Sequence, residues 1–311
     1  MNHGLWVGTR WTKPTKVYNN FRLNFNMYAS HLYAPIKAGV STLQNAEVNI
    51  NANMQTKNLW FGGGILEYSP DTYDYYEPRR FGDVFRRGSS FFGGTWWETN
   101  NARKYFVEVE LLGRRFVDFY NGYSLFYSLE NNYRFNSKLL VSHQISSNPR
   151  WNNIGFSHFE SGNPAFARRF VTTIENELSA KYNFTNRMGL TLVARHYNSS
   201  VNNHDMFRLS EDGNLSLATE LKQEKGNRNI NFFNVDMVYT WQFAQGSFVN
   251  IVWKNAISSF DQNQQFNYLE NIRQTFMTAQ NNNLSVKVIY FIDYNTLKNK
   301  KKYEEFVSMG S

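Results

Sequence analysis

The sequence YSLFYSLENNYRF, residues Tyr123–Phe135, alternates apolar and polar side chains along its length. Successive side chains of a β-strand point to opposite faces of the sheet, so this period of two predicts a strand with one apolar face and one wet face. The segment is longer than a usual soluble strand of about 5–6 residues, and it suits a strand that crosses roughly 25 Å of hydrocarbon at a tilt. The apolar face contains Tyr123, Leu125, Tyr127, Leu129, Tyr133 and Phe135, and the wet face contains Ser124, Ser128, Glu130, Asn132 and Arg134.

The same alternation recurs from end to end of the chain and predicts about thirteen strands. Short turns and long polar connections alternate between these strands, as in barrels that place short turns in the periplasm and long loops outside. The sequence therefore predicts an all-β fold, a transmembrane antiparallel up-and-down β-barrel. The predicted strands lie near residues 4–11, 17–29, 40–55, 58–69, 89–100, 104–116, 122–135, 138–147, 167–184, 187–198, 231–243, 247–258 and 283–295.

Composition agrees with an outer-membrane protein of a Gram-negative bacterium. The chain has 41% hydrophobic residues, a mean hydropathy of −0.56 and no run of about 18 apolar residues, so membrane-spanning helices are excluded. Aromatic residues make up 17% of the chain, and barrels place such residues in girdles at both membrane boundaries. The absence of cysteine excludes disulfides and thiolate chemistry.

The net charge of +8 does not indicate nucleic-acid binding, because the basic residues are scattered and only Lys298–Lys302 forms a run. The six histidines show no metal-ligand spacing, and no nucleotide-binding or hydrolase motif is present. We therefore expect no catalytic residues, no metal site and no cofactor. The expected partners are outer-membrane lipid, the barrel-assembly machinery during insertion and a glycan or oligosaccharide.

The wet faces of the strands predict a polar lumen with charges of both signs. A charge costs about 2–4 kcal/mol on the lipid face near mid-membrane, whereas inside the lumen it is hydrated or paired. Cross-strand pairing is the expected role of these residues. The spacing of Glu108 with Glu110 and of Glu175 with Glu177 also resembles a glycosidase carboxylate pair, which leaves a barrel-embedded hydrolase as an alternative. The predicted lumen residues are Glu108, Glu110, Glu175, Glu177, Asp236, Arg134, Lys181 and Arg195.

The loop Asp71–Arg87, DTYDYYEPRRFGDVFRR, is the best candidate for a ligand surface. Tyrosines stack on sugar faces, carboxylates bind hydroxyl groups and arginines hold anions. We favour a second role for the same residues, in which the loop packs on its neighbours or narrows the lumen. The candidate ligand-binding residues are Tyr73, Asp74, Tyr75, Tyr76, Arg79 and Arg80.

Three segments also carry a family resemblance: FNVDMVYTWQFAQGSFVNIVWKNAI at Phe233–Ile257, NNNLSVKVIYFIDYN at Asn281–Asn295 and YNFTNRMGLTLVARHYNSS at Tyr182–Ser200. They resemble the C-terminal outer-membrane barrel region of a bacterial family of unknown function. In that family the barrel usually follows a module resembling carbohydrate-binding family 9. The resemblance implies location in the outer membrane and an association with carbohydrate.

The strand count predicts an N-terminally truncated barrel. Both termini of a single-chain bacterial barrel ordinarily lie in the periplasm, which requires an even number of strands, and a familiar total is about sixteen. We expect residues 1–297 to be the C-terminal part of such a barrel, with an open seam between its first and last strands, and residues 298–311 to be a periplasmic tail. Met1–Arg10 contains no signal peptide pattern.

The sequence leaves three functions open. The leading hypothesis is a non-enzymatic outer-membrane barrel that anchors or displays a carbohydrate-binding-like module and binds or passes a glycan-like solute. The first alternative is a porin-like channel, and the second is the barrel-embedded hydrolase.

Overall fold

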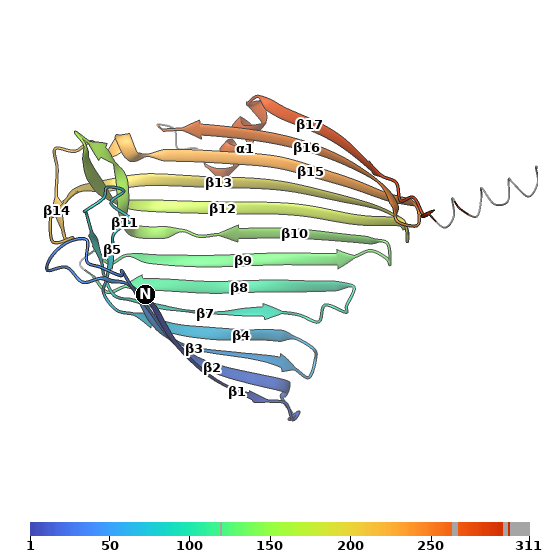
Figure 1. The fold of residues 1–311 in the computed structure, drawn as a ribbon, viewed down its shortest axis with the longest axis horizontal. Coiled ribbons are helices and arrows are strands. Elements are labelled where there is room, and N and C mark those ends of the chain that lie inside the picture. The colour runs from blue at the N-terminus through green and yellow to red at the C-terminus, as the bar shows by residue number, and fades with distance from the viewer. Residues whose placement is uncertain (119, 263–266, 295–297, 299–311) are drawn as a thin grey trace, which may run out of the picture.

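One large antiparallel β-sheet dominates the computed structural model, which describes all residues except 119, 263–266, 295–297 and 299–311 (Figure 1). Within these described residues the sheet has 15 strands, most of which form one path of hydrogen-bonded neighbours. The thirteen predicted strands are confirmed as this path, in the predicted up-and-down order. They are β1 (Asn2–Trp11), β2 (Tyr18–His31), β3 (Leu43–Thr56), β4 (Phe61–Ser69), β7 (Ser90–Glu98), β8 (Tyr105–Phe116), β9 (Tyr123–Arg134), β10 (Leu139–Ser147), β12 (Asn163–Thr185), β13 (Met188–Leu209), β15 (Arg228–Ala244), β16 (Ser247–Asp261) and β17 (Gln280–Ile289).

The connections sort by length between the two ends of the sheet (Figure 1). Tight turns, such as residues 186–187 between β12 and β13, lie at one end, which we call the short-turn end. The long connections lie at the opposite end, which we call the loop end. The predicted alternation of short and long connections is therefore confirmed.

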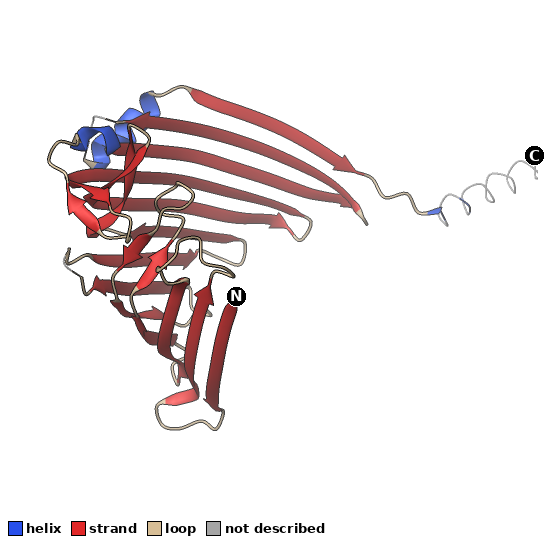
Figure 2. Cartoon of the chain, turned by 60° about the vertical axis from the view of Figure 1, so that its left-hand side comes forward, coloured by secondary structure: helices blue, strands red, loops and turns tan. Residues whose placement is uncertain are grey.

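The sheet curves around a hollow but remains open (Figures 1 and 2). In the described part of the chain, β1 pairs only with β2, and β17 pairs only with β16. All residues of both edge strands are exposed. The predicted open seam between the first and last strands is confirmed, and most of the predicted tail, residues 299–311, lies outside the described residues.

The two faces of the sheet reverse the polarity of a soluble protein. One face exposes large apolar side chains, among them Leu66, which is 67% exposed. On the opposite, concave face Asn24, Asn49, Ser128 and Asn132 are buried. Alternation explains the separation, because a period of two keeps most large apolar side chains on one face.

The structure corrects two predicted loops, because residues 148–166 and 199–230 are largely strand. The strand β11 (Arg150–Glu160) forms a hairpin with the start of β12, and β13 continues to Leu209. The hairpin turns at Ser161 and Gly162, which have φ of 50° and 78° and thus the left-handed backbone that a two-residue hairpin requires. The Ser-Gly dipeptide was the signal for this turn. Further elements of these long connections are β5 (Thr72–Asp74), β6 (Phe85–Arg87), β14 (Leu215–Leu217) and the 3₁₀ helix η1 (Gln223–Gly226).

Helix α1 (Tyr268–Met277) corrects the last predicted loop, residues 259–282, and packs over β13, β15 and β16. It begins at Asn267, whose side chain accepts a hydrogen bond from the Glu270 N–H. Within the described residues no helix has the length and apolar character needed to cross a membrane.

The dry hydrophobic core lies at the loop end, where parts of β12 and β13 pack against the long connections. Residues 71–87, 150–171 and 201–226 pack together there, and we call this unit the cap. Phe166 is fully buried between Phe85 and Phe207, and the Phe85 and Phe166 rings lie 5.0 Å apart. A second cluster contains Ala165, Ala167, Met206, Ala218 and Leu221.

Replacing Phe166 by alanine should lower the free energy of unfolding by about 3–5 kcal/mol, because it leaves a cavity where a fully buried ring stood. Urea unfolding in detergent, followed by tryptophan fluorescence, measures the loss. Phe81→Ala is the matched control, since Phe81 belongs to the same cap but is 91% exposed. Equal losses in the two variants would contradict a cap stabilised by this core.

Candidate functional site

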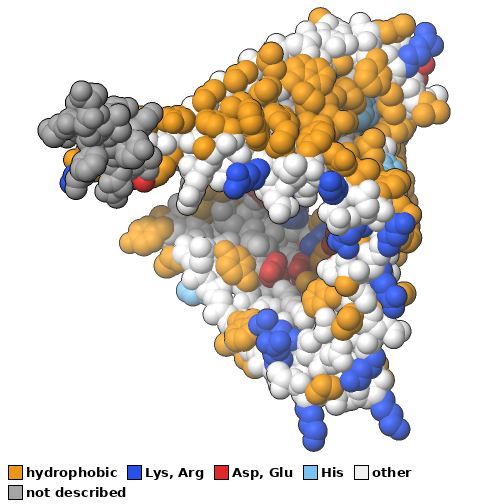
Figure 3. Space-filling view, turned by 90° about the vertical axis from the view of Figure 1, so that its right-hand side faces the viewer, with side chains coloured by type: hydrophobic (Ala, Val, Ile, Leu, Met, Phe, Trp, Pro, Cys, Tyr) orange, Lys and Arg blue, Asp and Glu red, His pale blue; other side chains and the backbone are white. Residues whose placement is uncertain are grey.

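A row of polar side chains crosses the concave face of the sheet from β7 to β13. Cross-strand register places Glu98 beside Glu108, and Glu108 beside Glu130. These three carboxylates, together with Glu110, line a cavity of about 560 Å³. Figure 3 shows acidic side chains inside the hollow and apolar side chains on the outer surface. Like charges directly opposite one another are unfavourable in a sheet, so this arrangement favours a cation or water between them.

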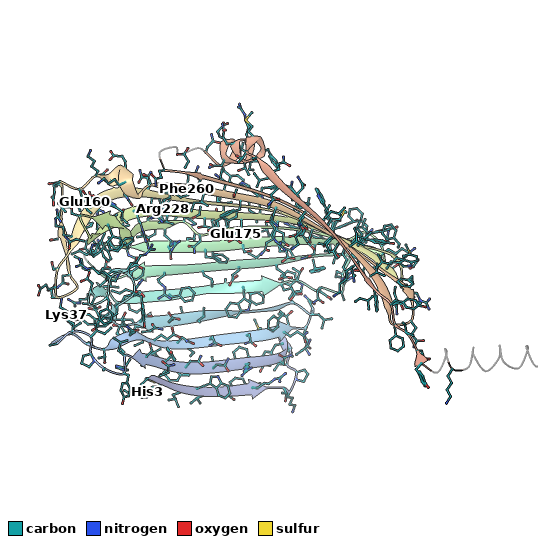
Figure 4. The ribbon with its side chains drawn as sticks, turned by 45° about the horizontal axis from the view of Figure 1, so that its top comes forward. His3, Lys37, Glu160, Glu175, Arg228 and Phe260 are labelled. Carbon is teal, nitrogen blue, oxygen red and sulfur yellow. The ribbon has the colours of Figure 1, made fainter. Side chains whose placement is uncertain are left out.

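Farther along the same row the charges are paired. Arg195 Nε lies 2.6 Å from a Glu177 carboxylate oxygen, and its Nη1 lies 3.4 Å from Asp236. Lys254 Nζ lies 3.7 Å from the other Asp236 oxygen. Glu175 lines a neighbouring cavity of about 180 Å³ with Glu177 and Arg195 and is labelled in Figure 4. Glu175, Glu177, Arg195 and Asp236 thus lie close together, whereas Glu108 and Glu110 line a different cavity.

Two predicted lumen residues lie apart from both clusters. The Arg134 guanidinium donates hydrogen bonds to the carbonyls of Asn101 and Arg103 and lies 5.7 Å from the Phe106 ring centroid. It therefore holds the β7–β8 turn at the short-turn end. Lys181 is exposed on β12, where it faces Leu140 and Thr191 in the register.

The predicted ligand loop, residues 71–87, folds into the cap. Its strands β5 and β6 form a small sheet of their own. One Asp74 oxygen accepts hydrogen bonds from the N–H groups of Tyr76 and Glu77, and the other lies 2.7 Å from Arg87 Nη2. Burial by itself raises the pKa of the Asp74 carboxyl, but the hydrogen bonds from Arg87, Glu77 and Tyr76 outweigh it and hold this pKa below its usual range.

The three predicted tyrosines of this loop differ in their surroundings. Tyr75 is buried, and its hydroxyl donates to the Ser41 carbonyl at 2.9 Å. Tyr76 is 72% exposed, and Tyr73 is half-buried on β5 opposite Arg86. Only Tyr73 and Tyr76 therefore present ring surface to solvent.

The two predicted arginines connect the loop to the β11–β12 hairpin. Arg79 lies over the Phe156 ring, 4.6 Å from its centroid. Arg80 pairs with Asp83 at 2.7 Å and donates to the Gly162 carbonyl and the Asn163 side chain. Most of the predicted ligand-binding side chains therefore make contacts within the cap.

Arg169 is a central cap residue that sequence reasoning missed. Its guanidinium donates to the Asn153 side chain and the Phe156 carbonyl, and Nη2 lies 3.9 Å from Glu77. Burial lowers the pKa of Arg169 to about 10, although Glu77 opposes the shift. No local motif marks such a residue, because its partners come from two other segments, β11 and the loop 71–87.

The chain belongs to the family described as "Domain of unknown function (DUF5916)", whose model matches residues 1–301. No curated protein and no solved structure matches the chain. In the described residues no group of three or more His, Asp or Glu side chains is placed to hold a metal ion.

Replacing Asp74 by asparagine should destabilise the cap near neutral pH by about 1–2 kcal/mol, because it removes a charged hydrogen-bond acceptor of Arg87. The folded-state pKa lies below the unfolded value of about 3.9, so the stabilisation is fully present above that value and is lost as pH falls through the folded pKa. Urea unfolding at pH 6 and at pH 3 measures the difference between parent and variant. A difference of equal size at both pH values would contradict this role of the carboxylate. Glu211→Gln, at an exposed cap position, is the control.

Proposed function

We propose that this DUF5916 chain forms the wall of an outer-membrane β-barrel that is non-enzymatic, anchors an associated carbohydrate-binding-like module and binds or passes a glycan-like solute through its polar hollow. The observation that carries the proposal is the reversed polarity of the sheet. In β15 and β16 the outer face presents Met237 and Trp253, while Asp236 and Lys254 lie on the concave face. Outer-membrane barrels face lipid with the apolar side and water with the polar side.

Aromatic side chains support the placement of the membrane boundaries. At the short-turn end Phe184 lies 4.7 Å from Tyr182 and 6.4 Å from Tyr239. At the loop end the exposed rings of Tyr68 and Phe91 lie 5.1 Å apart. Two such groups, one near each end of the strands, match the aromatic girdles of a membrane barrel.

Helix α1 supports the same placement of the lipid surface. It covers polar groups that lie on the outer face of the sheet, since Asn271 Oδ1 accepts from the side chains of Asn229 and Asn231 at 2.7 and 3.3 Å. The Tyr268 hydroxyl lies 3.2 Å from His196 Nδ1 on the same face. The helix thus buries its polar side and exposes Leu269, Phe276 and Met277, as expected of a helix that borders lipid.

Fluorophores attached to single introduced cysteines test the membrane placement. The parent chain contains no cysteine, so each label reports on one position. We expect a fluorophore on Leu111→Cys to be quenched by brominated lipid, and one on Glu110→Cys to be quenched by aqueous iodide. The two positions are sequence neighbours on opposite faces of β8, so each is the control for the other. Equal quenching of both by iodide would overturn the proposal.

The porin-like alternative is favoured by one observation, the acidic cavity around Glu98, Glu108 and Glu130. If the hollow conducts ions, these carboxylates should make it select cations. The double substitution of Glu108 and Glu130 by glutamine should then lower the cation-to-anion permeability ratio severalfold in planar bilayers. Lys181→Gln, a charge change outside this cavity, should leave the ratio higher than in the double variant. Absence of any conductance would reject the channel alternative and leave the anchoring role.

A further inference from the structure

A third cavity, of about 240 Å³, lies where the cap meets β8 and β9. Its walls include three arginines, Arg87, Arg114 and Arg150, and one carboxylate, Asp118. They also include the aromatic side chain of Trp151. None of these residues was among the predicted ligand-binding residues, and the cavity is separate from the acidic one on the concave face.

The arginines differ in whether the protein neutralises them. Arg87 pairs with Asp74 at 2.7 Å, and Arg114 pairs with Glu67 at 2.8 Å. Asp118 accepts hydrogen bonds from the N–H groups of Tyr120 and Asn121 through one oxygen. Arg87 and Arg114 are therefore each neutralised by a carboxylate of the protein.

Arg150 has no such counter-charge. Its Nε is buried and makes no hydrogen bond, and in the described residues no acidic side chain lies within ion-pair distance of its guanidinium. Backbone pairing fixes its position: at Arg150 the strand β11 lies between β9 and β12, with Ser124 on one side and Val171 on the other. Arg150 therefore has a buried N–H donor without an acceptor and a positive charge without a counter-charge, and a bound anion would supply both.

The remaining walls restrict which anion fits. Ser124, Asn152 and Asn153 supply polar groups beside Arg150, and Trp151 with Phe116 supplies apolar surface. A ligand with one carboxylate, several hydroxyls and a C–H face matches this combination of walls. The cavity volume suits a group of about one sugar ring.

We propose that this cavity binds a hexuronic acid, free or at the end of an oligosaccharide, with its carboxylate on the Arg150 guanidinium. The inference deepens the proposed glycan-like solute path, and it rests on that proposal for the route by which the ligand arrives. The site itself lies in the cap and does not require a closed barrel.

Binding can be measured with the full chain in detergent by calorimetry and by the fluorescence of Trp151 and the other tryptophans. Three probes separate the parts of the proposal: glucuronate, glucose, which has the ring without the charge, and acetate, which has the charge without the ring. We expect glucuronate to bind at least tenfold more tightly than either of the others. Arg150→Gln should weaken glucuronate binding at least tenfold, because it removes the cation that would hold the carboxylate.

Arg208→Gln is the matched control, because Arg208 lies in the cap but pairs with Glu220 away from this cavity. Arg150→Lys keeps the charge without the planar fork and should retain part of the affinity, which keeps the test valid if the glutamine variant fails to fold. Binding of glucose or acetate as tightly as glucuronate, full glucuronate affinity in Arg150→Gln, or no binding of glucuronate would overturn the proposal. These outcomes are independent of the lipid-quenching result, so failure of this site and failure of the membrane proposal are distinguishable.

Discussion

The continuous register of the main sheet is the constraint on which the rest of the structure depends. From Met188 opposite Trp241 to Val201 opposite Arg228, β13 and β15 stay paired without a shift. A shift of one residue would exchange the two faces of every later strand and place Asp236 on the apolar surface. The bulges of the long strands lie near strand ends or in the cap, for example between Asn183 and Thr185 and between Gln242 and Ala244. Irregular backbone is thus confined to places where a change of face costs little.

The cap has the opposite organisation. There the apolar side chains Phe85, Phe166 and Phe207 point inward, and ion pairs such as Arg80 with Asp83 lie outside them. The cap therefore resembles a small soluble domain attached to a sheet of reversed polarity. This division explains why β12 and β13 are so long, since one part of each strand belongs to the sheet and the other part to the cap core.

Periodicity was enough to predict the sheet but not the cap. The alternation in residues 123–135 depends only on nearest neighbours in sequence, so strand, face and direction follow from it. The cap depends on contacts between distant segments, such as Glu77 with the Phe156 N–H, and its strands alternate poorly because both faces are covered. The ion pairs of Asp74 and Arg80 show that this loop packs within the cap, the role that the sequence analysis favoured for it. Arg150 gave no local signal at all, because its lack of a partner is a property of the fold.

Two places in the fold hold polar groups away from their usual surroundings: the outer face under α1 and the cavity beside Arg150. The protein satisfies the first group itself and leaves the second without a partner. Asn229 and Asn231 lie on the apolar outer face, and α1 supplies the amide partner that the neighbouring apolar side chains could not supply. Arg150 has a buried Nε without a hydrogen-bond partner, and no acidic residue of the described chain neutralises its guanidinium. In the first case the fold completes its own hydrogen bonds with a helix whose apolar side faces away. At Arg150 the cavity has a cation, polar side chains and apolar side chains in its walls. A ligand of matching charge would supply the partner that the protein does not.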